Sequence, residues 1–558
     1  MKKHVINVLK STVNLPEEKI ENLIEIPPDP KLGDYAFPTF SLAKTYKKNP
    51  EQIAQDLAQK IKPTKEIEKI QAIGPYINFL INKNILTKTT LKQIQKQKDK
   101  YGSSTIGKKK KIIVEFSSPN IAKAFGIGHL RSTIIGNSIS NISSFLGYKV
   151  IRINYLGDWG TPFGKIIAGY KKWGSEKELS KHPVKHLHEI YVRSNNEPKF
   201  DEIGRVYFKK LESGDKEIKT LWNKFKECSV QDFKKIYSFF NVTFDVYSGE
   251  SLYNKKINQI INELESKKLL ERSDNALIVN LNKYNLGIGL IQKTDGTTLY
   301  LTRDIAAARQ RHSKYNFTKM FYEVGSEQKL HFKQLFKLLE LMGNKWAKDC
   351  THIEHGLYLD KDGKKFATRE GKTIFMEEIL EKTKELAKKE ILKREKIITK
   401  QELEKRVLLI TRAAIIYGDL RNYRERDTIF DIQSFISFEG NTGPYLLYTY
   451  ARAKSILRKA KYNPKKQYKI KKISEQEKSL IKQLSIFSDI VQNAYKNLAP
   501  NIIANYACQL AQTFNEFYHS EKVIGSENEY FLLAIVSAFS QVLRNTLLLL
   551  GIQTLEKM

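Results

Sequence analysis

The chain has 558 residues, with 95 lysines and arginines against 61 acidic residues and a formal net charge of +34 at pH 7. That length suffices for three or four domains, and so basic a surface favours a polyanionic partner, nucleic acid first, although an AT-rich genome would also load the surface with lysine. Cys228, Cys350 and Cys508 form no Cys-x-x-Cys pair, which excludes a disulfide framework or a cysteine-based zinc site and fits a reducing cytoplasm.

No targeting or membrane segment is expected. The first ten residues lack both a sustained apolar stretch and a small-residue cleavage site. The most apolar segment, residues 531–552, is interrupted by Ser537, Gln541 and Arg544, and its spacing predicts a buried bundle helix. We therefore expect a soluble, cytoplasmic protein.

Residues 1–105 are predicted to form a small α+β domain. Helical patterns occur at residues 1–11, 38–46 and 50–61, and the last of these begins with proline in its first turn. A strand-like run, residues 76–81, follows Gly74 and Pro75.

A second region, residues 106–376, begins with a β-loop-α-β pattern. An apolar strand at 112–114 leads to a loop with Gly126, Gly128 and His129, a helix to about 146, and a second strand at 149–153. Glycines in such a loop let a ligand approach the backbone, and the helix N-terminus offers free N–H groups to phosphate. Gly-x-Gly alone is a weak signal. A polar, helix-rich insertion is expected at about 172–268.

The rest of the chain is predicted to be helical. Residues 377–433 form a connector that is dense in lysine and glutamate. Residues 434–558 carry apolar side chains at three- and four-residue spacing, which is typical of an all-α bundle.

The string that follows the first strand of the β-loop-α-β pattern is far more specific than its glycines. It resembles the ATP-binding signature of class I aminoacyl-tRNA synthetases in the form found in arginyl-tRNA synthetases, and it reads Glu115-Phe-Ser-Ser-Pro-Asn-Ile-Ala-Lys-Ala-Phe-Gly-Ile-Gly-His-Leu-Arg-Ser-Thr133. Further family motifs continue the resemblance from about residue 25 to Met558.

This resemblance implies an α/β fold: a Rossmann-type parallel-sheet catalytic domain (106–376), an α+β N-terminal domain (1–105) that binds the tRNA D-loop, and an anticodon-binding helical bundle (434–558). It implies an arginine–tRNA ligase that forms arginyl-adenylate from ATP and L-arginine and transfers the arginyl group to the 3′ end of tRNA(Arg). Magnesium is expected with ATP, without a metal site on the protein. A monomer is expected, and so is activation of arginine only when tRNA is present.

The resemblance also implies an ATP site. Lys123 and His129 are expected to neutralise and hydrogen-bond the phosphates. Gly126 departs from the family, which usually has histidine there, and this removes one phosphate contact. The other expected ATP-site residues are Pro119, Phe125, Gly128 and His331.

Residues 362–373 resemble the basic loop that clamps pyrophosphate in this class. Lys365, Arg369 and Lys372 retain its positive charge, and clamping is largely electrostatic. Phe366, Ala367 and Glu370 depart from the usual pattern. An ordinary solvated basic hairpin is the alternative.

An arginine pocket is expected around the strand-like start and following helix of residues 299–308. A guanidinium is best bound by a carboxylate that accepts two N–H bonds, and the resemblance assigns this contact to Tyr300 and Asp304. Helix capping by Asp304 is the alternative. Family positions that contact arginine are matched by Glu115, by Asn120 and Gln328 at the α-amino group, and by a loop at 154–164 that shapes the pocket.

Two terminal regions resemble tRNA-binding parts of the family. Tyr76 is expected to stack on a D-loop base and Asn78 to bond a base edge, with burial of Tyr76 in the domain core as the alternative. Anticodon contacts are expected from Tyr445, Tyr448 and Arg452, which lie at i, i+3 and i+7 of one helix, and from Met558. An aromatic stripe of this kind also occurs in bundle cores.

Three rival hypotheses remain. His182, His186, His188 and Glu189 lie within eight residues, but Pro183 disturbs a helix there and no further ligand completes a shell, so we expect a solvated cluster and no metal. A different class I synthetase is disfavoured because the cysteine-specific relative uses a cysteine-bearing zinc site and aliphatic-specific relatives have no use for Asp304. A non-catalytic tRNA-binding paralogue is permitted by Gly126, Phe366 and Glu370.

Overall fold

The computed structural model describes residues 1–27, 29–294, 296, 299–360, 362–364, 375–470 and 472–558. The chain divides into two compact units. One contains residues 1–101, 452–488 and 509–543, and the other contains residues 102–451, 489–508 and 544–558.

The first unit contains a three-stranded antiparallel sheet in the order β1-β3-β2. Gly74, with φ of +53°, makes the tight turn between β2 and β3, and Asn49 caps the helix whose first residue is Pro50. The strands and helices of residues 1–101 are α1 (Lys2–Lys10), α2 (Glu17–Leu23), β1 (Tyr35–Pro38), α3 (Ala43–Tyr46), α4 (Pro50–Lys60), β2 (Ile67–Ile73), β3 (Tyr76–Ile81) and α5 (Lys83–Gln97).

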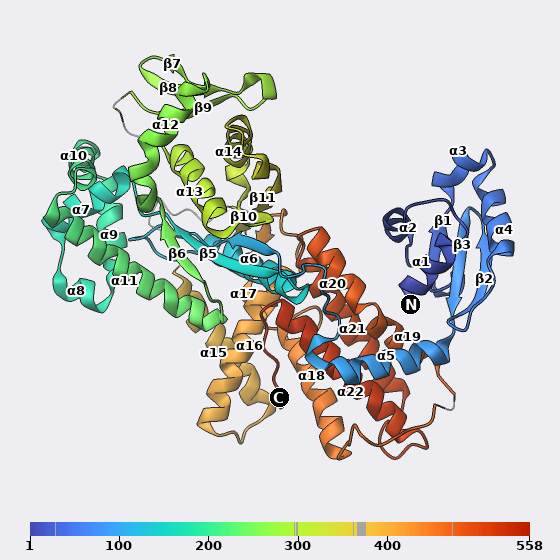
Figure 1. Ribbon diagram of the computed structural model, residues 1–558. Coiled ribbons are helices and arrows are strands. Elements are labelled where there is room, and N and C mark those ends of the chain that lie inside the picture. Colours follow the sequence, from blue (N-terminus) through green and yellow to red (C-terminus); the bar gives the residue numbers. More distant parts are fainter. Residues whose placement is uncertain (28, 295, 297–298, 361, 365–374, 471) are drawn as a thin grey trace. The chain divides into compact units, whose positions relative to one another are not determined.

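The second unit is built on a five-stranded parallel sheet in the order β11-β10-β4-β5-β6 (Figure 1). Its strands are β4 (Lys111–Glu115), β5 (Lys149–Leu156), β6 (Val246–Gly249), β10 (Lys319–Gly325) and β11 (Cys350–His355). The chain starts at β4, builds outward through β5 and β6, and then returns to the other side of β4 with β10. Parallel sheets bind ligands at the carboxyl ends of the two strands where the order reverses, here β4 and β10. The predicted Rossmann-type sheet is confirmed.

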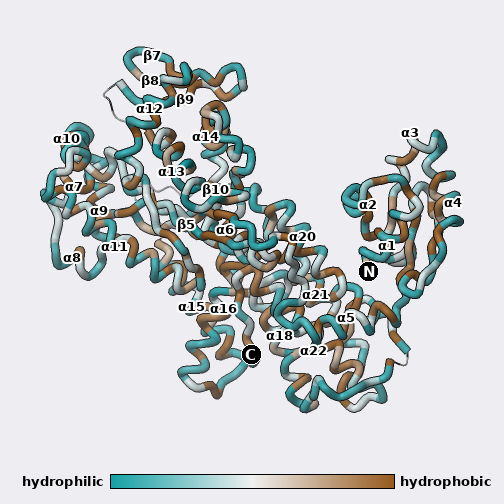
Figure 2. Tube along the Cα trace, viewed as in Figure 1, coloured by the Kyte–Doolittle hydropathy of each residue, from teal (hydrophilic) through white to brown (hydrophobic). Residues whose placement is uncertain are grey.

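Helices cover this sheet and bury its apolar strands. Four helices of the catalytic region are α6 (Ile127–Phe145), α12 (Ile257–Ser266), α13 (Tyr300–Tyr315) and α14 (Lys329–Leu341). The last three share a hydrophobic core with strand residues such as Ile113, Ile151 and Met320. Figure 2 shows hydrophobic residues of this unit gathered around β5 and α6.

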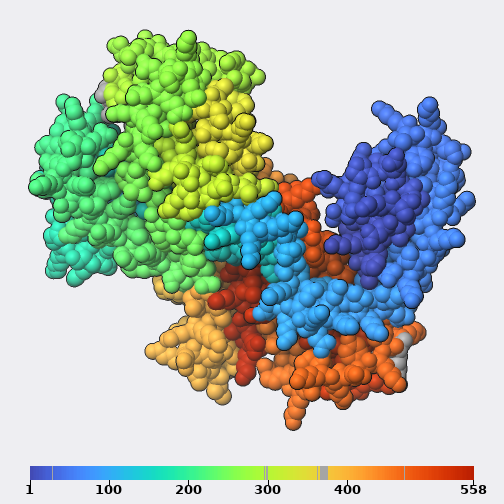
Figure 3. All heavy atoms as spheres, viewed as in Figure 1, coloured from blue at the N-terminus to red at the C-terminus, as the bar shows by residue number. Residues whose placement is uncertain are grey.

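The segment between β5 and β6 is helical and forms the teal-to-green surface in Figure 3. It comprises α7 (Thr161–Trp173), α8 (Glu176–Lys181), α9 (Pro183–Asn195), α10 (Phe200–Glu212) and α11 (Lys216–Phe240). The predicted insertion at 172–268 therefore extends too far, because β6 belongs to the main sheet. A second, antiparallel sheet was also missed; it consists of β7 (Glu271–Ser273), β8 (Ala276–Asn280) and β9 (Ile288–Gln292).

The C-terminal part of the chain is helical, as predicted. Two of its helices lie in the chain between the strands β12 (Tyr358–Leu359) and β13 (Thr428–Ile429), which pair in parallel, and the others follow β13. By length and composition α22 (Glu529–Leu549) is apolar enough to cross a membrane, but 78% of its most apolar window is buried in the protein. The other helices are α15 (Met376–Arg394), α16 (Lys400–Leu420), α17 (Ile432–Phe435), α18 (Gly443–Lys459), α19 (Glu475–Ser485), α20 (Phe487–Lys496) and α21 (Asn501–Ser520).

Candidate active site

The carboxyl ends of β4 and β10 carry a helix N-terminus that suits an anion. Gly126 is the N-cap of α6. The His129 N–H donates to the Gly126 carbonyl at 3.0 Å, and helix geometry leaves the N–H groups of Ile127 and Gly128 without a partner within the helix. Gly128 in this turn is exposed. Lys123, just before the turn, holds its ammonium 4.5 Å from the centre of the Tyr191 ring of α9. The glycines and the helix end thus lie together, and the phosphate contacts expected of Lys123 and of this turn stay predictions.

His129 is held in one tautomer. Its Nδ1 accepts a hydrogen bond of 3.1 Å from the Gly126 backbone N–H, so the ring proton lies on Nε2. Burial lowers the pKa of His129 to about 4, and the positive charge of Lys123 contributes. The ring is therefore neutral at pH 7 and offers one N–H donor, which matches its predicted role beside the phosphates.

The loop before α6 is shaped by strained backbone and buried contacts. Ser117, Ser118 and Ala122 have φ of 73°, 44° and 56°, a conformation that is costly for residues other than glycine and that concentrates at functional sites. Phe125 is 3% exposed and packs 5.4 Å from the His129 ring centre. Pro119 is buried too, and its carbonyl accepts the Gly157 N–H. Both residues hold the loop in shape rather than offer an exposed contact surface.

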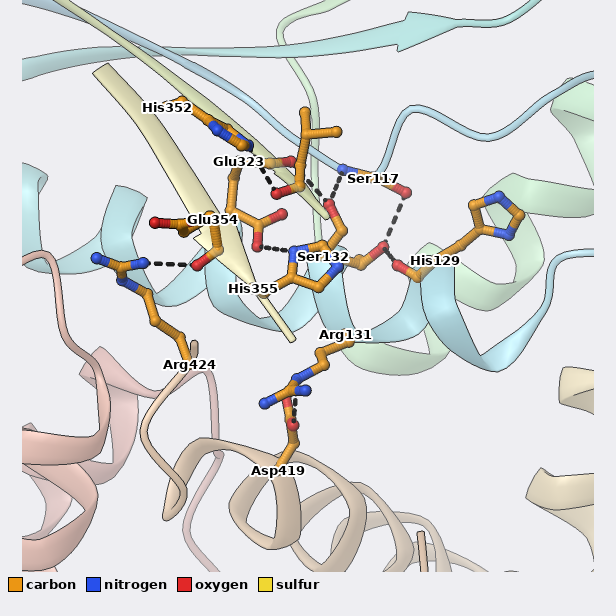
Figure 4. A network of polar contacts seen from close by, with 12 residues as sticks. Ser117, His129, Arg131, Ser132, Glu323, His352, Glu354, His355, Asp419 and Arg424 are labelled. Atoms are coloured by element: carbon orange, nitrogen blue, oxygen red, sulfur yellow. Dashed lines mark hydrogen bonds and ion pairs between the residues drawn. The ribbon is translucent and has the colours of Figure 1, made fainter. Parts of the chain in front are cut away.

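A polar network fixes α6 against β10 (Figure 4). The Ser132 hydroxyl accepts the Ser117 N–H at 2.9 Å and donates to the Glu323 carbonyl at 3.1 Å. The Glu323 carboxylate lies 2.8 Å from His355 Nδ1, and both side chains are buried. This network was not foreseen from the sequence, because its members are dispersed along the chain.

Three predicted residues converge where the first turns of α13 and α14 meet. Asp304 Oδ2 lies 2.8 Å from His331 Nε2, and the ring of Tyr300 lies 4.8 Å from that of His331. Helix α13 begins at Tyr300 with Leu299 as its N-cap, so the capping alternative for Asp304 is wrong, and so is the strand-like reading of residues 299–304. His331, expected near the adenosine, instead contacts the residues assigned to the guanidinium.

Glu115 lies beneath this group and already has a cationic partner. Its carboxylate is 2.5 Å from the Arg311 guanidinium, and the two side chains are 5% and 4% exposed. Burial raises the pKa of Glu115 to about 7. The predicted direct contact of Glu115 with arginine is therefore replaced by a contact with Arg311. The signal for Arg311 was its spacing of seven residues from Asp304, which places both on one face of α13.

Glu250 is a pocket residue that the sequence analysis missed. It follows β6 directly, at the carboxyl edge of the sheet. Burial raises its pKa to about 8, and the negative charge of nearby Asp304 is the second cause. Its carboxylate lies 3.3 Å from Arg303. The sequence analysis included the four residues of β6 in the insertion, so it did not recognise that Glu250 lies at the end of a strand of the main sheet.

Asn120 and Gln328 lie at the same edge of the sheet and are exposed. Asn120 forms an isolated parallel bridge with Gly157, and a side chain at Gly157 would overlap the Asn120 amide oxygen. Gln328 is the N-cap of α14, directly after β10. Both are accessible to a ligand, and their contact with the α-amino group stays a prediction.

The predicted pyrophosphate clamp cannot be placed. Lys365, Arg369 and Lys372 lie outside the described residues, as do Phe366, Ala367 and Glu370. The described chain resumes at Phe375, whose ring lies 5.7 Å from that of His188.

The histidine cluster is not the solvated group that we expected. His182 is exposed, but His186 accepts the Ser175 N–H at 3.0 Å and His188 is 8% exposed. The two histidines lie on different faces of α9, because they are two residues apart: His186 packs against the Tyr170 ring of α7, and His188 against the Phe375 ring. In the described part of the chain, no three histidine, cysteine or acidic side chains are grouped so that they could hold a metal.

The predicted D-loop contacts differ in accessibility. Tyr76 is half-buried, and its ring lies 5.9 Å from that of Phe40, which is 55% exposed. Asn78 is 2% exposed on the central strand β3, so its predicted base-edge bond is contradicted. The sequence of β3 does not reveal this burial. In a strand with one exposed face, alternate side chains would be accessible, but both faces of this small sheet are covered.

The predicted anticodon contacts are half-buried. Tyr448 lies 5.9 Å from the Arg394 guanidinium. Arg452 donates to the Asn515 amide oxygen at 2.9 Å and lies 5.4 Å from the Tyr518 ring. Tyr445 and Met558 retain some exposure as well, and no bound RNA tests these four roles.

Family comparisons cover nearly the whole chain. A family model described as tRNA synthetases class I (R), catalytic domain, matches residues 90–432. An arginyl tRNA synthetase N terminal domain matches residues 1–81, and a DALR anticodon binding domain matches residues 446–558.

Similar proteins agree with these matches. The arginine–tRNA ligases of Clostridium perfringens and Clostridium kluyveri are each 44% identical to the chain, over 572 and 567 aligned residues, with 100% of both chains covered. The arginyl-tRNA synthetase structure from Plasmodium falciparum has a TM-score of 0.84 at 26% identity, covering 100% of this chain and 99% of that one. The Thermus thermophilus arginyl-tRNA synthetase shares the fold, with a TM-score of 0.84 at 22% identity and the same coverage.

Proposed function

The chain belongs to the arginyl-tRNA synthetase family and is an arginine–tRNA ligase of class I, and we propose here how its own residues perform that reaction. The substrates are L-arginine, ATP and tRNA. The observation that carries the assignment of residues is the meeting, at one edge of one sheet, of an anion-binding helix end and a group of three carboxylates, of which Glu115 is buried and Asp304 and Glu250 are partly exposed.

The phosphate side prepares ATP for in-line attack. The arginine carboxylate attacks the α-phosphate and pyrophosphate leaves, so the protein's task is to position the two substrates and to stabilise negative charge on phosphorus. His129 donates from Nε2, the first turn of α6 donates backbone N–H groups, and Lys123 supplies a positive charge. Lys365, Arg369 and Lys372 clamp the departing pyrophosphate, and magnesium enters with ATP as part of the substrate.

The acidic side selects the amino acid. Asp304 and Glu250 bind the guanidinium, with the Tyr300 hydroxyl as a further acceptor, because planar N–H donors pair well with carboxylates. Asn120 and Gln328 bind the α-amino group at the exposed rim. Glu115 does not contact the substrate directly. It acts through its ion pair with Arg311, which lies beneath the pocket.

The tRNA contacts complete the proposal. Tyr76, with the exposed ring of Phe40 beside it, stacks on a D-loop base, and Tyr445, Tyr448, Arg452 and Met558 contact the anticodon loop. A monomer in the cytoplasm is the expected state. The non-catalytic alternative rests on Gly126; it is opposed by the fixed donor tautomer of His129 and by an intact acidic pocket.

The proposed pocket is tested by a neutral analogue of its substrate. The purified protein should charge total tRNA with arginine and fail with citrulline, which has nearly the same shape but no positive charge. Equal charging with both amino acids would contradict selection by Asp304 and Glu250.

A further inference from the structure

The amino edge of the parallel sheet, opposite the candidate active site, carries a row of lysines. The adjacent strands β5, β4 and β10 begin with Lys149, Lys111 and Lys319, and Lys111 is directly paired with Lys149. Neighbouring strands lie about 4.8 Å apart, so these side chains start close together. We call six residues the amino-edge lysines: Lys108, Lys109, Lys110, Lys111, Lys149 and Lys319. All but Lys111 are exposed.

The backbone that presents these lysines is unusual. Lys108 and Lys109 both have left-handed conformations, with φ of 44° and 59°. Hydrogen bonds from Lys109 N–H to the Gly147 carbonyl (2.9 Å) and from Lys149 N–H to the Lys110 carbonyl (3.0 Å) hold the turn in place. Glycine or asparagine would adopt this conformation at a lower cost, so the sequence keeps lysine in spite of backbone strain. Strain of this kind concentrates at functional sites.

The charge of this edge is not neutralised within the protein. Among the described residues, none forms an ion pair with any amino-edge lysine, although the chain makes many lysine–carboxylate pairs elsewhere. Like charges at such short spacing repel one another. An anion that binds across several strands would remove this repulsion.

Aromatic rings flank the lysines. Tyr148 precedes Lys149 and stacks on Tyr495 of α20 with ring centres 5.1 Å apart and planes 25° apart. The Lys319 ammonium lies 5.6 Å from the centre of the Tyr495 ring. Both rings are half-buried, so each presents part of its surface. Lysine rows with adjacent aromatic rings are typical of nucleic-acid surfaces, where cations follow phosphates and rings contact sugars or bases.

We propose that the amino-edge lysines, with Tyr148 and Tyr495, bind the phosphate backbone of the tRNA at a segment away from its 3′ end. The inference rests on the proposed function for the identity of the RNA. The strand spacing is comparable to the spacing of charges along a nucleic acid backbone, and the contact carries no sequence information. This surface adds affinity for tRNA and takes no part in the chemistry, which occurs at the other edge of the sheet.

The test compares two full-length variants with equal loss of charge. The first replaces Lys108, Lys109, Lys110 and Lys149 by glutamine. The control replaces four exposed lysines of the helical insertion by glutamine, namely Lys209, Lys210, Lys216 and Lys219. The affinity for tRNA is measured as a function of KCl concentration. Each lost phosphate contact reduces the slope of log K against log salt by about 0.9, so the first variant should lose about 3 to 4 from the slope of the parent.

Kinetics supply the second readout. The first variant should raise the KM for tRNA at least tenfold while kcat at saturating tRNA stays within twofold of the parent. The control should keep the slope and the KM of the parent. Lys149→Glu alone should raise the KM for tRNA as well, which guards against a folding defect in the fourfold variant.

The remaining outcomes distinguish a failure of the proposed surface from a failure of the proposed function. Equal salt slopes for the two variants would overturn the proposed surface. It would also be overturned if the first variant lost affinity for heparin or for an acidic protein but kept its affinity for tRNA. A parent that charges no tRNA would instead contradict the proposed function, whatever the slopes are.

Discussion

Asp304 lies close enough to Glu115 and Glu250 for its negative charge to raise the pKa of both carboxyls, and this gives the pocket a measurable proton balance. Burial raises the pKa of Glu250 to about 8 and that of Glu115 to about 7, and the charge of Asp304 contributes to both. At pH 7 the Glu250 carboxyl is therefore largely protonated and the Glu115 carboxyl partly so. A bound guanidinium favours the ionised carboxylates and lowers these pKa values.

Arginine binding should consequently release protons at pH 7. The affinity for arginine should rise as the pH increases toward 8, where Glu250 ionises without help, and should level off above that. Calorimetry in buffers of different ionisation enthalpy measures the release directly. Glu250→Gln should remove most of it, and an enthalpy that does not depend on the buffer in the parent would contradict the paired-carboxylate pocket.

Asp304 should be essential for the use of arginine as a substrate, but not for the binding of tRNA. Asp304→Ala leaves a desolvated guanidinium without its main partner, which costs on the order of 3–5 kcal/mol, or a factor of about 10²–10⁴ in kcat/KM for arginine. The Kd for tRNA should stay within twofold. Asp201→Ala, at an exposed position of α10, is the matched control. Unchanged charging by the Asp304 variant would invalidate the assignment of the pocket.

Gly126 has room for the histidine that the family usually carries. Its φ of −86° and ψ of 170° suit any residue, and an added Cβ would approach no atom closer than His129 Nδ1 at 3.9 Å. Gly126→His should add one phosphate contact and lower the KM for ATP by about tenfold to a hundredfold, because a hydrogen bond to a charged group contributes about 1.5–3 kcal/mol. An unchanged or higher KM for ATP, measured by initial rates of charging, would show that the chain does not need this contact.

At the scale of elements, α6 is joined to α16 by a buried ion pair directly behind His129. Arg131 Nε lies 3.2 Å from Asp419, with both side chains 1% exposed, and Arg131 also donates to the carbonyls of Leu357 and Arg426. A buried pair of this kind strongly resists the loss of one partner. The helix that presents His129 is thereby fixed to the connector (Figure 4).

Arg131→Met should lower the free energy of unfolding by about 3–5 kcal/mol, because Asp419 is then left buried without its counter-ion. The double variant Arg131→Met with Asp419→Leu should recover more than half of that loss. Urea denaturation of the two single variants and the double variant measures the coupling. Additive effects would show that the pair is not energetically linked.

Long, strongly patterned elements were predictable from the sequence, and short ones were not. The strands β4 and β5 are β-branched and continuous, and the loop before α6 carries its own chemistry, so the phosphate side could be predicted. The strands β6 and β7 have four and three residues and are stabilised mainly by pairing within their sheets, which local pattern does not reveal. Glu250 was missed for that reason, and the burial of Asn78 depends on helices that pack over both faces of β3.

At the scale of the whole molecule, a net charge of +34 coexists with an acidic substrate pocket. The positive and negative groups lie at opposite edges of one sheet. The carboxyl edge carries Asp304 and Glu250, and the amino edge carries lysines. General basicity favours RNA, and in the proposed assignment the local negative field of the pocket favours a cationic amino acid. Composition alone predicted the first partner and could not predict the second, because the pocket depends on three carboxylates from three separate segments.

ATP–pyrophosphate exchange across all twenty amino acids, with and without total tRNA, tests the central claim most directly. We predict exchange with arginine alone, and only when tRNA is present. Exchange with any other amino acid would contradict the proposed pocket, and arginine exchange of equal rate without tRNA would contradict the expected dependence on tRNA. No exchange with any amino acid, together with tight tRNA binding, would contradict the assignment as a ligase and favour a non-catalytic tRNA-binding protein.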